Sequence, residues 1–149
     1  MKSSIYFLVL LTTLFCAKSA KTAGSGVRKT YLLQYFAKVN WYDAFLNCQR
    51  NGLRLATINS ADEEKTLIKI VEKAGMKNNH FWISAADLAK EGRFSWYSTG
   101  DLVTYKNFRK SQPDNYRGNE HCVQFSNIYA WNDVRCNALA YFICEKAMK

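Results

Sequence analysis

Three short segments near the C-terminus are the most informative part of this chain: Gln112-Pro113-Asp114, Glu120-His121-Cys122 and Trp131-Asn132-Asp133, with Cys136 just beyond. Together they supply three carboxylates and two carboxamides, all of which are hard oxygen donors, close to two cysteines. Oxygen donors of this kind suit Ca²⁺ far better than zinc or copper, which favour nitrogen and sulfur. The sequence therefore predicts a calcium site in this region.

The residues around these segments are typical of short strands and one irregular loop. From about 107 to 119 the sequence has no helical or strand periodicity, and a loop of that length is usually functional or disordered. The cysteine that follows it favours an ordered, functional loop. Short apolar runs separated by Gly, Asp and Asn indicate strands joined by tight turns. The predicted strands cover residues 81–83, 94–97, 103–105, 122–125 and 141–144.

Two amphipathic helices are predicted upstream of these strands. The first begins after the cap residue Asn40 and stops at Gly52. The second follows the capping-box sequence Ser60-Ala61-Asp62-Glu63 and stops at Gly75. A first strand at 31–38 and an extended segment at 53–58 complete the pattern, which favours an α+β fold. The apolar faces consist of Trp41, Ala44, Phe45 and Cys48 in the first helix and of Leu67, Ile70, Val71 and Ala74 in the second.

The N-terminus has the features of a secretory signal. Met1-Lys2 precedes an apolar run that is shorter than the ~20 residues needed to span a bilayer, and small residues follow at Ala17 and Ser19. We therefore predict a signal peptide over residues 1–19, a flexible tail over 20–30 and one domain over 31–149, in a secreted, extracellular protein. A buried N-terminal helix is the alternative reading of the apolar run. With no second apolar run, no membrane anchor is expected.

Removal of the signal leaves four cysteines, at Cys48, Cys122, Cys136 and Cys144. An even number in an exported protein predicts disulfides, although spacing alone leaves three connectivities open. A zinc site is the alternative use, but the chain lacks the Cys-x₂-Cys pairs typical of one.

The net charge of +9 comes from basic residues that are scattered along the chain. Solvated surface charge is the favoured interpretation, while attraction to anionic microbial surfaces or sulfated glycans remains open. No nucleic-acid partner is expected.

The chain resembles the C-type lectin-like domain, in its galactose-type variant, from about residue 31 to 146. It looks like a short-form secreted lectin of the kind found in insects. The resemblance implies two helices, two small antiparallel sheets, a long calcium-binding loop, and two disulfides that pair Cys48 with Cys144 and Cys122 with Cys136. The motifs that carry it, in the family's order, are Trp41-Tyr42-Asp43-Ala44, residues 53–58, Phe81-Trp82-Ile83-Ser84, Glu91-Gly92-Arg93-Phe94 and Trp131-Asn132-Asp133.

The resemblance also assigns a site. The oxygens leave about two of calcium's 6–8 positions open, which in the family are filled by two sugar hydroxyls. Pro113 is expected to be cis, as in the family. The implied calcium ligands are Gln112, Asp114, Glu120, Asn132 and Asp133, and the implied sugar contacts are Gln112, Asp114, Tyr116, Glu120 and Asn132.

The order amide–Pro–acid at Gln112 and Asp114 reverses the family's mannose-type order. Gln112 is able to donate a hydrogen bond and Asp114 only accepts, which favours the hydroxyl pattern of galactose or N-acetylgalactosamine. Tyr116 is predicted to stack on the sugar, in the place where galactose-type relatives commonly have Trp. The alternative is an exposed loop tyrosine.

Some relatives hold a second calcium close by, where this chain has Asn115 and His121 in place of acids. Asp87 and Glu91 remain as donors, so we expect one principal calcium site. For His121 two interpretations stay open, an exposed residue beside a disulfide and a source of pH dependence.

The predicted function is that of a secreted, calcium-dependent lectin for galactose-type glycans on microbes or cell surfaces, as in innate immunity. A lectin-like domain that binds a protein partner is the alternative. No enzymatic activity is expected, because the carboxylates are assigned to the metal and no catalytic triad pattern is present. Agglutination would require several binding sites, so a homo-oligomer remains an open possibility. The sequence has no coiled-coil heptads that would build such an oligomer.

Overall fold

The computed structural model describes residues 29–126 and 128–147 of the chain. The predicted signal peptide and residues 20–28 of the predicted tail lie outside these residues. Lys29 and Thr30, which we assigned to the tail, belong to the first strand. The Lys29 ammonium lies 2.9 Å from Glu63 and 2.6 Å from the Thr57 hydroxyl, so the start of the domain is fixed by polar contacts.

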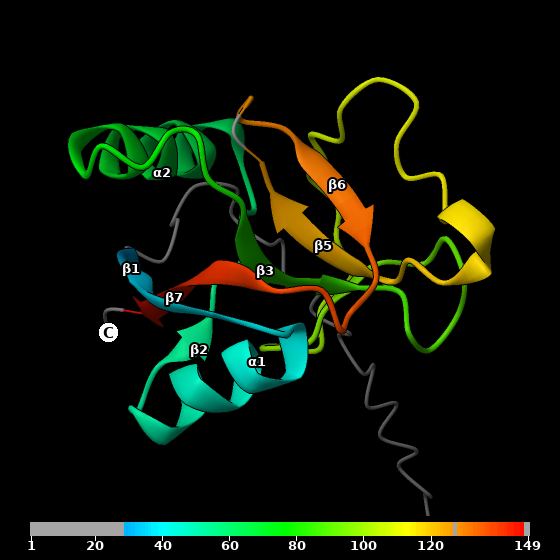
Figure 1. The fold of residues 1–149 in the computed structure, drawn as a ribbon, viewed down its shortest axis with the longest axis horizontal. Coiled ribbons are helices and arrows are strands. Elements are labelled where there is room, and N and C mark those ends of the chain that lie inside the picture. Colours follow the sequence, from blue (N-terminus) through cyan, green and yellow to red (C-terminus); the bar gives the residue numbers. More distant parts are fainter. Residues whose placement is uncertain (1–28, 127, 148–149) are drawn as a thin grey trace, which may run out of the picture.

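The described residues form two α-helices and seven strands, and both helices precede β3 (Figure 1). In order they are β1 (Lys29–Val39), α1 (Trp41–Arg50), β2 (Arg54–Leu55), α2 (Ala61–Lys73), β3 (Phe81–Ala86), β4 (Ser95–Trp96), the 3-10 helix η1 (Tyr116–Gly118), β5 (Cys122–Phe125), β6 (Trp131–Val134) and β7 (Ala140–Ala147).

The strands form one sheet in the order β1-β7-β3-β5-β6, with β2 added to β7 and β4 added to β3. Every pair is antiparallel except β3 with β7, where Phe81 lies opposite Tyr141 and Trp82 opposite Phe142. The resemblance predicted two small antiparallel sheets. Both antiparallel groups exist, but the parallel pair joins them into a single sheet. This junction was not predictable from the two strands alone, because an apolar run does not specify which distant strand it pairs with.

Both helices begin where the caps predicted. The Asn40 side chain accepts a hydrogen bond of 2.9 Å from the Asp43 amide, and Ser60 accepts one of 3.2 Å from the Glu63 amide. The Glu63 carboxylate reaches back to the amide of Asn59 instead of that of Ser60, so only one half of the capping box forms. Ala74 was assigned to the apolar face of α2 but is exposed at the helix end.

The two helices anchor different parts of the sheet, and Figure 1 shows them on opposite sides of the β1–β7 pair. The buried face of α1 carries Cys48, which forms a disulfide with Cys144 of β7. The second disulfide joins Cys122, at the start of β5, to Cys136 just after β6. Both pairings implied by the resemblance are confirmed.

The long loop projects from the end of the sheet formed by β5 and β6, drawn in yellow at the right of Figure 1. The strand predicted at 103–105 does not form. Instead Leu102 makes an isolated bridge with Ser95, and the Val103 amide bonds to the Phe94 carbonyl. The chain then runs irregularly to η1, as the absence of periodicity indicated.

Candidate functional site

Three of the predicted ligands come together at the base of the long loop. Carboxylate oxygens of Asp114, Glu120 and Asp133 all lie within 4.8 Å of one another. Asp114 and Glu120 come from the loop, whereas Asp133 comes from β6. Like charges this close repel one another, and a divalent cation among them would relieve that repulsion.

Asp133 is fully buried and holds the loop through its carboxylate. Its Oδ1 accepts a hydrogen bond of 3.2 Å from the Asp114 amide, and its Oδ2 accepts one of 2.7 Å from the Asn115 amide. A strand residue therefore fixes the backbone position of the loop residue that carries a second carboxylate. These two hydrogen bonds tie the backbone of the loop to β6.

Glu120 and Asn115 close the loop on itself. The Glu120 amide donates to Asn115 Oδ1 at 2.9 Å, and Glu120 Oε2 accepts from the Tyr116 amide at 3.3 Å. Burial raises the pKa of Glu120, and the carboxylates of Asp133 and Asp114 raise that pKa further, against the Tyr116 amide and Arg135, which lower it. Glu120 therefore lies in a partly buried and predominantly acidic environment.

The two predicted carboxamide ligands present oxygens without partners. Gln112 Oε1 and Asn132 Oδ1 are buried, and neither atom has a hydrogen-bond partner among residues 29–126 and 128–147. An unpaired buried oxygen costs about 1–3 kcal/mol, so such atoms call for an explanation. Both belong to the set of hard oxygen donors, and a bound Ca²⁺ would satisfy them. The residues present therefore fit the metal that the sequence predicted.

The backbone of the loop is unusual at the same place. The Gln112–Pro113 bond is cis, as expected. Ser111, Asn115 and Arg117 have φ angles of 68°, 41° and 58°, in the left-handed region that residues other than glycine rarely adopt. Strain of this kind concentrates at ligand-binding sites.

Sequence reasoning missed one residue that supports the site, Glu64 of α2. Its carboxylate is buried and accepts hydrogen bonds from the Tyr105 hydroxyl at 2.6 Å, from the Asn107 amide group at 2.8 Å and from the Trp131 indole at 2.8 Å. The available signal was a carboxylate three residues before Leu67, on the apolar face of the helix.

Backbone hydrogen bonds also join the start of the long loop to Trp131, the two segments that Glu64 contacts. The Trp131 amide donates to the Asn107 carbonyl at 2.7 Å, and the Arg109 amide donates to the Trp131 carbonyl at 3.0 Å. The beginning of the loop is thereby fixed to the residue that precedes Asn132 and Asp133.

Tyr116 lies at the edge of the site and is 59% exposed. The guanidinium of Arg117 sits 5.1 Å from the centre of its ring. A shallow pocket of about 260 Å³ adjoins this ring and is lined by Tyr116, Arg117, Asn119, Glu120 and Arg135. An exposed aromatic ring beside a predicted metal ligand is compatible with the stacking role expected for Tyr116, which stays a prediction.

Comparison with known proteins agrees with this arrangement. A family model described as the lectin C-type domain matches residues 37–146. The chain is 40% identical over 116 residues to salivary C-type lectin 1 of Aedes albopictus, an alignment that covers 72% of this chain and 76% of that protein. It is 33% identical over 110 residues to the galactose-specific lectin nattectin of Thalassophryne nattereri, covering 72% of this chain and 68% of that protein.

Solved structures share the fold as well. The carbohydrate-recognition domain of the mouse scavenger receptor C-type lectin matches with a TM-score of 0.72 and 30% identity, covering 85% of this chain and 95% of that chain. The α+β fold, the long loop and the two disulfides agree with these matches. The chain belongs to the C-type lectin family. Because this is a family of carbohydrate-binding proteins and not of enzymes, the expectation of a non-enzymatic protein is confirmed. None of the helices formed by the described residues is long and apolar enough to cross a membrane.

Proposed function

We propose that this protein is a secreted, calcium-dependent lectin that prefers galactose and N-acetylgalactosamine. The observation that carries the proposal is the combination of three converging carboxylates with two buried, unpaired carboxamide oxygens. The fold alone would not suffice, because one fold serves many functions. The donor set is what connects this chain to calcium.

The residues proposed to hold calcium are Gln112, Asp114, Glu120, Asn132 and Asp133. When bound, the ion supplies coordination positions for two neighbouring sugar hydroxyls, because Ca²⁺ takes 6–8 oxygens and five side chains leave some of them open. Asp133 orients the loop through the Asp114 and Asn115 amides, as described above.

Sugar selectivity is assigned to Gln112 and Asp114. The Gln112 carboxamide has N–H groups to donate as well as an oxygen to accept, whereas the Asp114 carboxylate only accepts. A sugar whose hydroxyls present the opposite arrangement would leave a polar group unpaired, at a cost of about 1–3 kcal/mol. We assign the apolar face of galactose to the exposed ring of Tyr116. Nattectin, a relative described as galactose-specific, supports the same preference.

The apolar N-terminal run and the disulfides support secretion. Glycans on microbes or cell surfaces are the proposed partners, in a role within innate immunity.

A protein partner is the second candidate, and one surface feature favours it. Tyr35 and Phe36, on the edge strand β1, stack with ring centres 5.4 Å apart, and Phe36 is 89% exposed. Exposed aromatic residues of this kind are enriched in protein interfaces. The same surface is available for a homo-oligomer, which would supply the several sites that agglutination needs.

Retention on immobilised galactose, on immobilised mannose and on a glycan-free matrix, each with calcium and with EDTA, tests the proposal. We expect retention on galactose alone, with release by EDTA. Asp114→Ala should abolish retention, whereas Asp101→Ala, which removes an exposed carboxylate away from the loop, should not. Equal retention on the glycan-free matrix, or retention unaffected by EDTA, would refute the sugar proposal in favour of a protein partner.

A further inference from the structure

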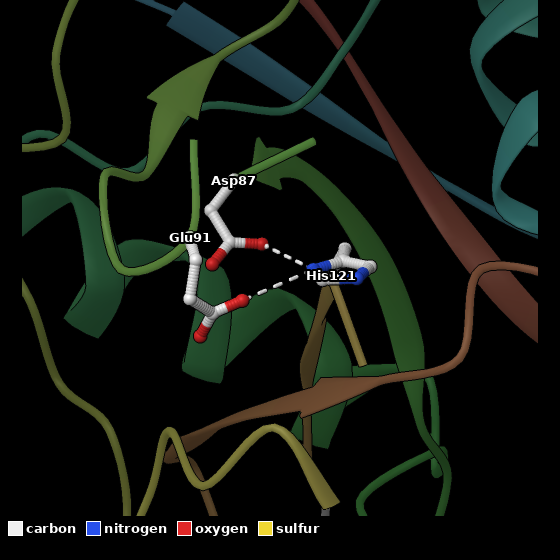
Figure 2. A group of neighbouring side chains, drawn as sticks. All are labelled: Asp87, Glu91 and His121. Carbon is white, nitrogen blue, oxygen red and sulfur yellow. Dashed lines mark hydrogen bonds and ion pairs between the residues drawn. The ribbon is translucent and has the colours of Figure 1, made fainter. Parts of the chain in front are cut away.

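A second group of side chains with metal-ligating atoms lies beside the proposed calcium site and shares none of its ligands. Figure 2 shows Asp87, Glu91 and His121 pointing toward one another. His121 Nδ1 lies 3.1 Å from Asp87 Oδ1 and 3.4 Å from Glu91 Oε2. The three donor atoms all lie within 4.8 Å of one another.

Each of these side chains is held in place by other contacts. Asp87 follows β3 directly and is only 2% exposed, and its other oxygen, Oδ2, accepts a hydrogen bond of 2.7 Å from the Gly92 amide. The Asp87 amide donates to the His121 carbonyl at 3.1 Å, which locks the two backbones together. A buried carboxylate therefore directs its free oxygen at an imidazole nitrogen.

Asn115 holds the third side chain. Its Nδ2 donates to Glu91 Oε2 at 2.6 Å, while its Oδ1 accepts from the Glu120 amide at 2.9 Å. A carboxylate oxygen that ligates a metal still accepts such a bond, and hydrogen bonds of this kind orient metal ligands in proteins.

The donor chemistry distinguishes this group from the oxygen-only calcium site. One imidazole nitrogen with two carboxylate oxygens is a set typical of zinc, which binds nitrogen and oxygen at about 2.0–2.2 Å in a tetrahedron. Ligands at that distance and at tetrahedral angles lie about 3.3 Å apart. The two separations from His121 Nδ1, 3.1 and 3.4 Å, are close to this value. Two carboxylates also balance the charge of a divalent ion.

We propose that Asp87, Glu91 and His121 form a zinc site in which water takes the fourth position. The three protein ligands are His121 Nδ1, Asp87 Oδ1 and Glu91 Oε2, with Asn115 and the Gly92 amide as the groups that orient them. Because Asn115 also bonds to the Glu120 amide, zinc at this site would brace the base of the calcium loop. The proposal does not depend on sugar binding.

The zinc proposal is tested by titrating the metal-stripped secreted protein with ZnCl₂. Calorimetry follows the titration in the presence of millimolar calcium. We expect one zinc ion per chain with calcium present. His121→Ala and Glu91→Gln should each weaken zinc binding by at least about tenfold. His80→Ala is the matched control, because His80 is the only other histidine of the chain and lies outside this group.

Nitrogen NMR of the imidazole provides a second readout. Zinc should shift the Nδ1 resonance of His121 and leave the His80 resonances unchanged. Glu91 is exposed, so Glu91→Gln keeps the test decisive even where His121→Ala folds poorly. Absence of saturable zinc binding would reduce the group to an ion pair and overturn the proposal. Loss of zinc binding in His80→Ala, or complete displacement of zinc by calcium, would overturn it as well.

Discussion

The carboxylate of Glu64 in α2 accepts a hydrogen bond of 2.8 Å from the indole of Trp131, the first residue of β6. The two following residues are the proposed ligands Asn132 and Asp133. The other oxygen of Glu64 accepts from Tyr105 and Asn107, just before the long loop. One carboxylate therefore fixes both segments that bring the proposed calcium ligands together.

We predict that Glu64→Gln lowers both the stability of the domain and its affinity for calcium. Glutamine offers one acceptor oxygen in place of two, which leaves a buried donor unpaired and lowers the free energy of unfolding by about 1–3 kcal/mol. Urea unfolding and calcium titration measure the two effects. Glu72→Gln, at an exposed position of the same helix, is the matched control. Unchanged calcium affinity in Glu64→Gln would show that the contact supports the fold only.

The hydrogen bond from Tyr105 to Glu64 predicts a pH dependence at high pH. Burial and the neighbouring Glu64 raise the pKa of Tyr105 to about 12, from the usual 10.0. Because the pKa is higher in the folded state, the contribution of the phenol to stability is complete below pH 10 and is lost as the pH rises to about 12. The difference in unfolding free energy between wild type and Tyr105→Phe should therefore shrink over this interval. A difference in unfolding free energy that stays constant up to pH 12 would contradict the raised pKa of Tyr105.

Calcium should stabilise the folded domain. Extracellular calcium sites have dissociation constants of roughly 10⁻⁴–10⁻³ M, and an ion present at 100 times that value stabilises by about 2.7 kcal/mol. We expect scanning calorimetry to show a higher Tm in 10–100 mM calcium than in EDTA, roughly in this range of stabilisation. Asp133→Asn should lose most of the increase, whereas Asp101→Asn should retain it. Equal Tm values in calcium and EDTA would argue against a calcium site.

Because the order of Gln112 and Asp114 is proposed to set the sugar preference, we predict that reversing this order changes the preference. The double variant Gln112→Glu, Asp114→Asn reverses donor and acceptor while keeping the net charge. We expect its retention to shift from galactose toward mannose, with binding still dependent on calcium. Competition with free galactose and free mannose measures the shift, and calcium affinity serves as the control. A variant that binds calcium normally and still prefers galactose would place the selectivity elsewhere, with Tyr116→Ala as the next test.

Local signals predicted much of this fold. The caps at Asn40 and Ser60 located both helices, because a side-chain acceptor for the first free amides is a short-range requirement that the sequence states directly. The disulfide partners required the family resemblance, since spacing left three pairings open. The candidate site was also predictable in part, because its ligands lie within three short segments.

Features that depend on distant segments were not predictable. The parallel pairing of Phe81 with Tyr141 brings strands together from far apart in the sequence, and neither strand specifies it. The segment 103–105 is apolar enough for a strand but finds only an isolated bridge next to it, at Leu102. Glu64 was overlooked because a charged residue early in a helix usually faces solvent. Its three donors become its neighbours only after folding.

The pairing of the first and last strands has a practical consequence. Lys29 lies opposite Ala147, so the chain enters and leaves the described domain at neighbouring points. Figure 1 places these points at the left, whereas the long loop projects at the right. A tether attached to either end would therefore leave the loop facing away from its support. Two copies joined end to end by a linker would each have the proposed glycan-binding loop unobstructed.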